Sequence, residues 1–443
     1  MQRAWKKALA FLMVGAIAAA SMSGCSSSPS KTSSAAANGK KVLTVAWWGN
    51  QVRNQRTTDA LKEYSKENPG VTFETQVYQF SSYWDKLATA AAGGSLPDVI
   101  QMDYGYLDQY NASNLLVDLG SYISSGKLDV SSVDKNILNT GTINGKVVAI
   151  PAGINSPSLC YNKSLLDKIG VKVKDYMTID DFAAISDEVF KKTGYKTNYA
   201  YQQGQPVFEY MLRAQHKVLF EDGKLGVDNA SQLEPYYDLR EEGRKAGWLI
   251  DPNVFTTTVN TTADQDPFVY GTKPETRSWC VFCNSNELIN YQNIVNGKFE
   301  IGVTTYPSAD PKASGYLKPC MFFCVTSNSK DPDEGAKFVN YITNSEACNN
   351  ILLGERGMPV SSKIAAEITP KISDSDKRAF AYLNDVVTPN CSAVNPPAPS
   401  GSTEVAQLLK DLDEQIDYGK ITAKDAAQQL FDKGNTTMAS KKS

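Results

Sequence analysis

A regular alternation of apolar and amphipathic segments near the N-terminus is the feature that most constrains the fold. Its first member, residues 42–48, is a continuous apolar run of the kind found in strands buried on both faces. The pattern predicts strands at 42–48, 71–77 and 98–102 and helices at 53–68 and 83–92. Strands and helices that alternate at this spacing predict an α/β fold with a parallel sheet and right-handed crossovers.

The 443 residues exceed what one hydrophobic core usually supports, so we expect two domains. Further strands are predicted at 158–162, 278–282, 299–303 and 319–326, and further helices at 163–169, 179–192, 206–217, 231–246, 287–296, 332–343, 376–387, 404–418 and 423–433. Ligands of open parallel sheets bind at the carboxyl ends of the strands. The first three strands end in aromatic and hydrogen-bonding residues, so we expect a binding site at that edge.

The first 25 residues have the pattern of an export signal. Arg3, Lys6 and Lys7 precede an apolar stretch at 8–20 that is too short to span a bilayer. The sequence Met-Ser-Gly-Cys that ends at Cys25 resembles the bacterial lipobox, which implies cleavage after residue 24 and lipidation of the cysteine. A plain secretory peptide is the alternative. Residues 25–40 are then the lipidated cysteine and a flexible, Ser- and Ala-rich tether that holds the protein on the extracellular face of the cell membrane.

Composition narrows the possible functions. The formal charge of -3 argues against a basic nucleic-acid binder, so no nucleic-acid partner is expected. His216 is the only histidine in the sequence, which makes triad hydrolysis and histidine-based metal sites poor hypotheses. We therefore expect no catalytic residues, no cofactor and no metal.

Seven cysteines remain beside Cys25. Cys280 and Cys283 have C-x-x-C spacing, but they fall on a predicted strand without the turn of a redox motif. Cys320 and Cys324 also share a predicted strand. One interpretation is a four-thiolate zinc site built from the two pairs, and a second is a single disulfide. The preferred interpretation is that the thiols are buried and act as small apolar side chains.

Several short motifs occur in an order that resembles bacterial extracellular solute-binding proteins of the maltose-binding-protein class, the substrate receptors of ABC importers. They are LTVAWWG (43–49), NPGV (68–71), YWDKL (83–87), GSLPDV (94–99), LVDL (116–119), IP (150–151), YNK (161–163), TIDDF (178–182), SNSK (327–330) and GMP (357–359). The resemblance covers residues 43–360, and the tail at 419–427 fits as well. Each motif is weak alone, and the order carries the resemblance.

The resemblance implies a two-lobed fold of the periplasmic-binding-protein type II, with a ligand cleft between the lobes. We expect an N-terminal lobe of residues 41–153 plus 308–353 and a C-terminal lobe of residues 154–307 plus 354–443. It also implies a monomer whose partners are a carbohydrate, the transmembrane subunits of an ABC permease, and the membrane through the lipid anchor.

A sugar offers C–H groups on its faces and hydroxyls at its edge, so its site needs aromatic rings and planar polar groups. The candidate ligand-binding residues are Trp48, Arg53, Asp103, Asn155, Trp248, Trp279, Tyr306 and Arg356. Trp84 is a weaker candidate, and Tyr306 and Arg356 rest on the resemblance. Tryptophans are more often core residues, and strand alternation predicts that Trp47 is buried.

The resulting hypothesis is a membrane-anchored binding protein, not an enzyme, that captures an oligosaccharide by lobe closure and delivers it to a permease. Two alternatives stay open. One is a sensory binding protein for a membrane kinase. The other is a surface glycan-active enzyme, for which Asp103 and Glu209 would be the two carboxylates.

Overall fold

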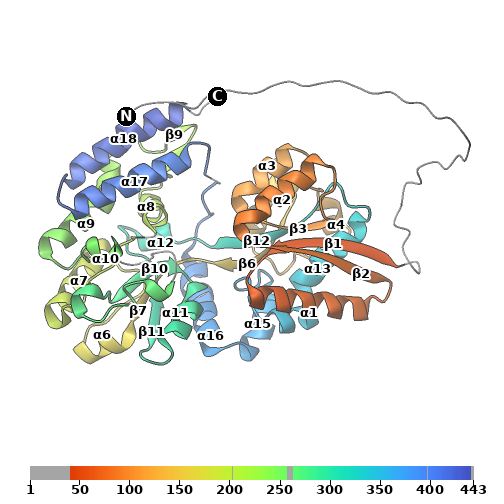
Figure 1. The fold of residues 1–443 in the computed structure, drawn as a ribbon, viewed down its shortest axis with the longest axis horizontal. Coiled ribbons are helices and arrows are strands. Elements are labelled where there is room, and N and C mark those ends of the chain that lie inside the picture. Colours follow the sequence, from red (N-terminus) through yellow and green to blue (C-terminus); the bar gives the residue numbers. More distant parts are fainter. Residues whose placement is uncertain (1–39, 202, 257–262, 397, 441–443) are drawn as a thin grey trace, which may run out of the picture.

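The computed structural model describes residues 40–440 except 202, 257–262 and 397. The predicted signal peptide at 1–24, Cys25 and nearly all of the tether lie outside the described residues. Among the helices of the described part, none combines the length and apolar character needed to cross a bilayer. Two bodies lie side by side, each with a sheet enclosed by helices (Figure 1).

The N-terminal lobe is built on a five-stranded sheet with the order β2-β1-β3-β12-β6. Its strands are β1 (Lys41–Trp48), β2 (Val71–Tyr78), β3 (Val99–Met102), β6 (Ile150–Asn155) and β12 (Lys318–Val325). β1 pairs in parallel with β2 and β3, while β12 runs antiparallel between β3 and β6. The predicted parallel sheet is thus confirmed for its first three strands, and a strand from far along the chain completes it.

Helices cover both faces of this sheet, which explains why β1 is apolar throughout. Leu43, Val45 and Trp47 pack on one face with α1 (Gln51–Glu67), α13 (Pro332–Asn344) and α14 (Glu346–Leu352). Ala46 and Trp48 pack on the other face with α2 (Phe80–Ala92) and α3 (Leu107–Ala112). The burial predicted for Trp47 is confirmed.

Asp98 ties the start of β3 to two other parts of the N-terminal lobe. Its Oδ2 accepts hydrogen bonds from the backbone N and Oγ1 of Thr44, at 2.8 and 2.6 Å. Its Oδ1 accepts from Ser329 Oγ at 2.7 Å and from the backbone N of Lys330 at 3.2 Å. One side chain therefore satisfies donors on β1 and on the segment that leads into α13.

We expect Asp98→Ala to lower the free energy of unfolding by about 2–3 kcal/mol, because it leaves four part-buried donor contacts without an acceptor. Urea unfolding followed by circular dichroism measures the change. Asp108→Ala removes an exposed carboxylate from α3 and should change the same quantity by less than about 0.5 kcal/mol. Equal effects of the two substitutions would contradict the assigned role of Asp98.

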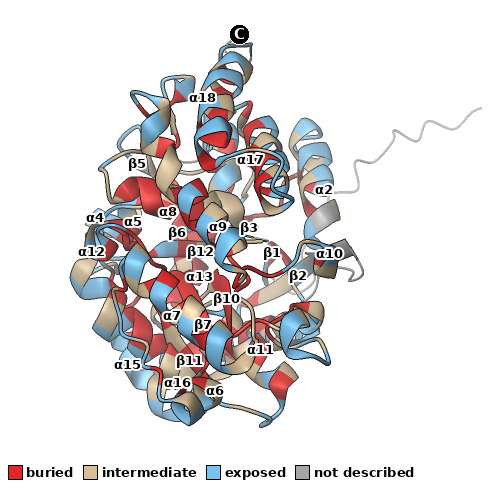
Figure 2. Ribbon diagram, turned by 90° about the vertical axis from the view of Figure 1, so that its left-hand side faces the viewer, coloured by how far each residue is buried: buried red, intermediate tan, exposed pale blue. Residues whose placement is uncertain are grey.

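The C-terminal lobe has a three-stranded antiparallel sheet with the order β10-β7-β11. Its strands are β7 (Pro157–Asn162), β10 (Cys280–Asn284) and β11 (Ile301–Thr304), and its helices include α6 (Lys163–Ile169), α7 (Ile179–Thr193), α8 (Gly204–Arg213), α9 (Glu234–Ala246), α11 (Glu287–Val295), α16 (Asp374–Ala381), α17 (Ser402–Asp417) and α18 (Ala423–Ser440). Buried residues concentrate on the strands and on the inward faces of the helices (Figure 2). Most of the predicted strands and long helices are confirmed within a few residues at each end. The helix predicted at 423–433 continues to Ser440, and the helix predicted at 376–387 ends as a π-helical turn.

Short elements complete the described chain. They are α4 (Gly120–Ser124), α5 (Lys135–Asn139), α10 (Asn253–Thr256), α12 (Pro311–Ser314) and α15 (Ser362–Ile368), the hairpins β4 (Thr142–Ile143) with β5 (Lys146–Val147) and β8 (Phe220–Glu221) with β9 (Lys224–Leu225), and six 3₁₀ turns, among them Tyr104–Tyr106 after β3. α15 packs against α14 beside the N-terminal sheet, although it falls in the range 354–443 that we predicted for the C-terminal lobe. The lobe boundaries stay a prediction.

Three chain segments connect the lobes. β6 runs directly into β7 with only Ser156 between them. The chain returns between β11 and β12, and it crosses again after α14, where Ile154 pairs with Met358. Gly153 and Gly357 lie at this contact, where an added Cβ would come within 2.3 Å of Arg356 O and 2.6 Å of Cys320 Sγ, respectively. Close backbone packing therefore requires glycine at both places.

Candidate functional site

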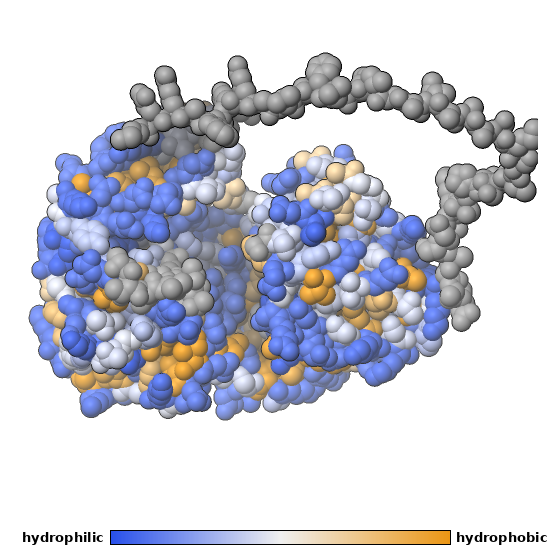
Figure 3. Space-filling view, viewed as in Figure 1, coloured by the Kyte–Doolittle hydropathy of each residue, from blue (hydrophilic) through white to orange (hydrophobic). Residues whose placement is uncertain are grey.

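A cleft lies between the two lobes. The carboxyl ends of β1, β2 and β3 point toward the C-terminal lobe (Figure 1), and the space-filling view shows a furrow between the bodies (Figure 3). At one end of this cleft is a cavity of about 330 Å³. Asp103, Tyr104 and Lys318 of the N-terminal lobe line it, together with Gln203 and Glu209 of the C-terminal lobe.

Two further cavities extend the cleft. One of about 550 Å³ lies between Arg56 and Glu355 of the N-terminal lobe and Asn286 of the C-terminal lobe. The other, of about 520 Å³, is formed within the C-terminal lobe. It shares Gln203 with the first cavity and Glu287 with the second, so the three form one extended binding surface.

An aromatic patch of Trp48, Phe80, Trp84 and Tyr106 marks the cleft edge of the N-terminal lobe. Trp48 ends β1, Phe80 and Trp84 are four residues apart on α2, and Tyr106 follows β3. Trp84 and Tyr106 stack with ring centroids 3.7 Å apart and planes 7° from parallel. Phe80 is 49% exposed, and the indole N–H of Trp84 has no hydrogen-bond partner among the described residues. The patch thus offers flat apolar surface above a buried indole N–H that is unpaired among the described residues.

Polar groups stand on both sides of the cleft. Glu209 accepts a hydrogen bond from Gln205 Nε2 at 2.8 Å, and burial raises the pKa of its carboxyl. Asn155 donates from Nδ2 to Asn286 Oδ1 at 3.0 Å, a contact between the end of β6 and the turn before α11. The amide oxygen of Asn155 is buried and accepts no hydrogen bond from the described residues. The first cavity therefore holds an unused acceptor beside a carboxylate and Lys318.

The structure brings three of the predicted site residues to the cleft. Asp103 and Asn155 line the same cavity, and Trp48 belongs to the aromatic patch, where it is 8% exposed. Asp103 Oδ1 accepts a hydrogen bond from the backbone N of Gly105 at 2.9 Å, so one oxygen also shapes the turn after β3. Glu209, named with Asp103 for the enzyme alternative, lines this cavity from the other lobe.

The two predicted arginines are held by the protein itself. Arg53 Nε lies 2.7 Å from Glu355 Oε1 and 2.9 Å from Oε2, in a largely buried ion pair. Arg356 donates to Gln101 Oε1 and Thr57 Oγ1, each at 2.9 Å, and burial lowers the pKa of its guanidinium to about 10. Both arginines fasten the Gly354–Pro359 connection to the N-terminal lobe in this conformation.

The structure places Trp248, Trp279 and Tyr306 in the core of the C-terminal lobe rather than at the cleft. All three are at most 1% exposed. Trp279 donates from its indole N–H to Thr197 Oγ1 at 2.8 Å, and Tyr306 donates from its hydroxyl to Cys283 O at 2.9 Å. The polar atoms of Trp279 and Tyr306 are satisfied internally, and all three rings are too buried to offer a surface to a ligand in this conformation.

The seven cysteines of the described chain are buried or half-buried free thiols. Cys280 and Cys283 lie on β10 of the C-terminal lobe, whereas Cys320 and Cys324 lie on β12 of the N-terminal lobe. The two pairs lie on strands of different sheets in different lobes, so the four-thiolate alternative is wrong.

Several cleft residues were missed by the sequence reasoning, namely Tyr104, Gln203, Lys318, Asn198, Asp266 and Glu287. Tyr104 directly follows the predicted strand end at 102–103, and that position was the available signal. Lys318 begins β12, and the others lie on loops or at a helix start, so their approach to the cleft depends on the lobe arrangement.

Two α/β lobes joined by crossing strands around a polar and aromatic cleft define a two-lobed binding protein. The chain belongs to the family of bacterial extracellular solute-binding proteins, whose model matches residues 59–381. An arabinooligosaccharide-binding protein of Bacillus subtilis is 24% identical over 53% of this chain and 54% of its own length. A lactose-binding protein of Rhizobium radiobacter is 25% identical over 43% of this chain and 46% of its own. The matches thus span about half the length of these two relatives.

Solved structures agree with this assignment. An extracellular solute-binding protein family 1 member from Alicyclobacillus acidocaldarius superposes with a TM-score of 0.77 at 25% identity, covering 91% of this chain and 99% of that one. The expected two-lobed fold and the family resemblance are both confirmed.

Proposed function

We propose that this protein captures an oligosaccharide in the cleft by lobe closure and delivers it to the transmembrane subunits of an ABC importer. The observation that carries the proposal is the cleft itself, with stacked aromatic rings on one lobe and carboxylate and amide groups on both. The names of the two relatives, which bind arabinooligosaccharides and lactose, support a carbohydrate.

The chemistry of the cleft fits a sugar. Pyranose C–H faces pack on indole and phenol rings, while hydroxyls exchange hydrogen bonds with carboxylate and amide groups. Asp103, Asn155 and Glu209 supply acceptors, and the indole N–H of Trp84 supplies a donor. Because these groups belong to different lobes, a ligand that touches both stabilises the closed form and gives the permease a distinct shape to recognise.

Calorimetric titration of the full-length protein in detergent with a panel of neutral oligosaccharides tests this function. We expect micromolar or tighter binding of at least one oligosaccharide and, by small-angle X-ray scattering, a smaller radius of gyration on binding. Turnover of the bound glycan would instead favour the enzyme alternative. A response to peptides and none to oligosaccharides would overturn the carbohydrate assignment.

The lipid anchor is part of the same proposal and rests on the sequence before residue 26. Two acyl chains at about 0.8 kcal/mol per buried methylene hold a protein at a membrane far longer than one chain does. We expect Cys25→Ser to move the protein from the membrane fraction to the medium when cells are fractionated. Ser26→Ala is the matched control and should leave it in the membrane fraction. Retention of the Cys25→Ser protein would contradict the anchor.

A further inference from the structure

We propose that the cavity within the C-terminal lobe binds a protonated amine, so that the captured oligosaccharide carries an amino sugar. The inference rests on the proposed function and names the class of sugar. The cavity, of about 520 Å³, is large enough for a monosaccharide unit and opens on the cleft through its shared residues Gln203, Glu287 and Asn290.

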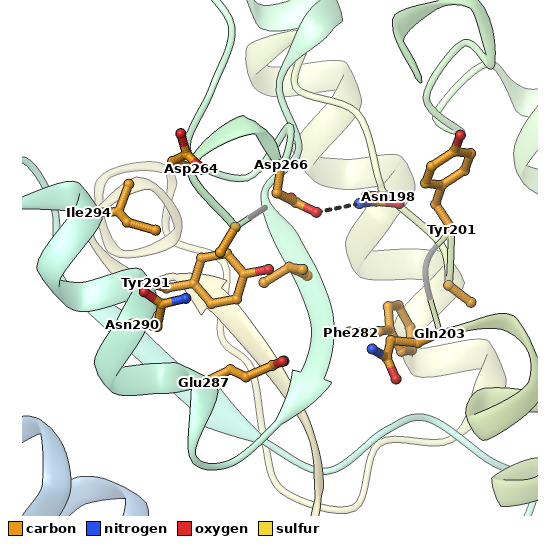
Figure 4. Close-up of a pocket in the computed structure, with 13 residues that line it drawn as sticks. Asn198, Tyr201, Gln203, Asp264, Asp266, Phe282, Glu287, Asn290, Tyr291 and Ile294 are labelled. Carbon is orange, nitrogen blue, oxygen red and sulfur yellow. Dashed lines mark hydrogen bonds between the residues drawn. The ribbon is translucent and has the colours of Figure 1, made fainter. Parts of the chain in front are cut away.

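Among the described residues, the charged side chains that line this cavity are all acidic. Asp264, Asp266 and Glu287 line it, and no lysine or arginine does so among the described residues. Asp266 is 4% exposed, lines the cavity and points its carboxyl group to Asn198 (Figure 4). Its oxygens accept hydrogen bonds only from uncharged donors in the described chain, the backbone N of Phe268 at 2.8 Å and Asn198 Nδ2 at 3.3 Å. A buried carboxylate without a cationic partner is costly, and a ligand cation would relieve that cost.

A second observation points to a ligand with hydrogen-bond donors. Asn198 is 3% exposed, and its amide nitrogen is turned to Asp266 (Figure 4). Its amide oxygen is buried and has no donor in the described chain. An ammonium group carries three donors and a positive charge, so it can satisfy this oxygen and the carboxylate together.

The remaining lining favours an organic cation over a metal ion. Tyr201, Phe282 and Tyr291 also line the cavity, with Tyr291 between Asp266 and Glu287 in Figure 4, and aromatic faces attract ammonium groups. No group of three or more carboxylate, thiol or imidazole side chains in the described chain is placed to hold a metal. The carboxylates are thus spread along a cavity in which a sugar ring, and not a single ion, would reach them.

Binding should also release protons. Burial raises the pKa of Asp266 to about 7, and the titratable groups that face it, Glu287 and Tyr291 on α11 and Cys280 on β10, are all acids. A bound ammonium favours the carboxylate and lowers this pKa. We therefore expect the heat of binding at pH 6.5 to vary with the ionisation enthalpy of the buffer. An Asp266 with a purely structural role would not produce this dependence.

The test is titration of the full-length protein in detergent with matched tetrasaccharides. The probes are glucosamine and galactosamine tetramers, their N-acetylated forms, the neutral glucose and galactose tetramers of the same linkage, and spermidine. We expect an amino tetramer to bind at least 10-fold more tightly than its neutral counterpart. Asp266→Asn and Glu287→Gln should each abolish most of the difference between the affinities for the amino and the neutral tetramer. Asp432→Asn, an exposed carboxylate on α18, should change neither.

The outcomes separate the two proposals. Neutral tetramers that bind as tightly as amino tetramers would overturn the amine site and leave oligosaccharide capture standing. Spermidine that binds as tightly as the amino tetramers, with loss in Asp266→Asn, would support the amine site and overturn the oligosaccharide assignment. No binding of any probe would overturn the inference, while binding of another neutral oligosaccharide would still support the proposed function.

Discussion

Trp84→Ala is expected to weaken oligosaccharide binding by about 50-fold, which corresponds to the two or more kcal/mol that a well-placed aromatic residue contributes at a binding site. The substitution removes the ring that stacks on Tyr106 and the free indole N–H beside it. A sugar face would lose its platform and a hydroxyl would lose its donor. Calorimetric titration with the best ligand of the panel measures the effect.

Controls separate this loss from damage to the fold. Tyr418→Ala removes another partly exposed ring, at the end of α17, and should leave the dissociation constant within about twofold. Trp84→Phe keeps a ring and should retain part of the affinity. If Trp84→Ala binds as tightly as the unchanged protein, the aromatic patch is not the ligand platform.

Arg240→Met is expected to lower the free energy of unfolding by about 3–5 kcal/mol, the usual cost of breaking a buried ion pair from one side. Arg240 is 2% exposed on α9. Its NH1 lies 2.7 Å from Asp417 Oδ2 and its NH2 lies 3.3 Å from Asp413 Oδ2, so it joins α9 to α17. Without it, two buried carboxylates lose their positive partner. Urea unfolding provides the measurement.

The same helix offers a matched control. Arg244 is about a third exposed and lies 4.0 Å from Glu241, so Arg244→Met should cost less than about 1 kcal/mol. The opposite ranking of the two variants would contradict the role of Arg240. None of the described residues that line the three cleft cavities lies on α9 or α17, so we expect folded Arg240→Met protein to bind the ligand with unchanged affinity.

Local patterns were sufficient to predict most of the fold. The strand at β1 could be identified because helices cover both faces of its sheet, which demands an apolar run. The helix α13 could be identified because Asp331 precedes Pro332, and its Oδ1 indeed accepts a hydrogen bond from the backbone N of Glu334. The resemblance placed residues 308–353 in the N-terminal lobe, but the pairing of β12 between β3 and β6 was not predicted, since no local signal links residues so far apart.

The candidate site was harder to predict because ring orientation depends on tertiary packing. Trp248 packs over Gly243, where an added Cβ would come within 2.4 Å of the indole, and the ring fills space that the glycine leaves open. The glycine five residues earlier was a signal that sequence reasoning did not use. Trp279 precedes a strand whose residues are buried on both faces, so alternation could not assign it to a ligand-facing side. Asp103 was easier because it follows a strand end directly.

The position of β12 has a consequence for biogenesis. The edge strand β6 pairs with the rest of the N-terminal sheet only through β12. This partner strand lies more than 150 residues later in the chain. A nascent polypeptide that has emerged only as far as residue 300 therefore cannot assemble this sheet. Folding of the N-terminal lobe would therefore be completed only after β12 has been synthesised. During export, the chain would stay incompletely folded until that strand becomes available.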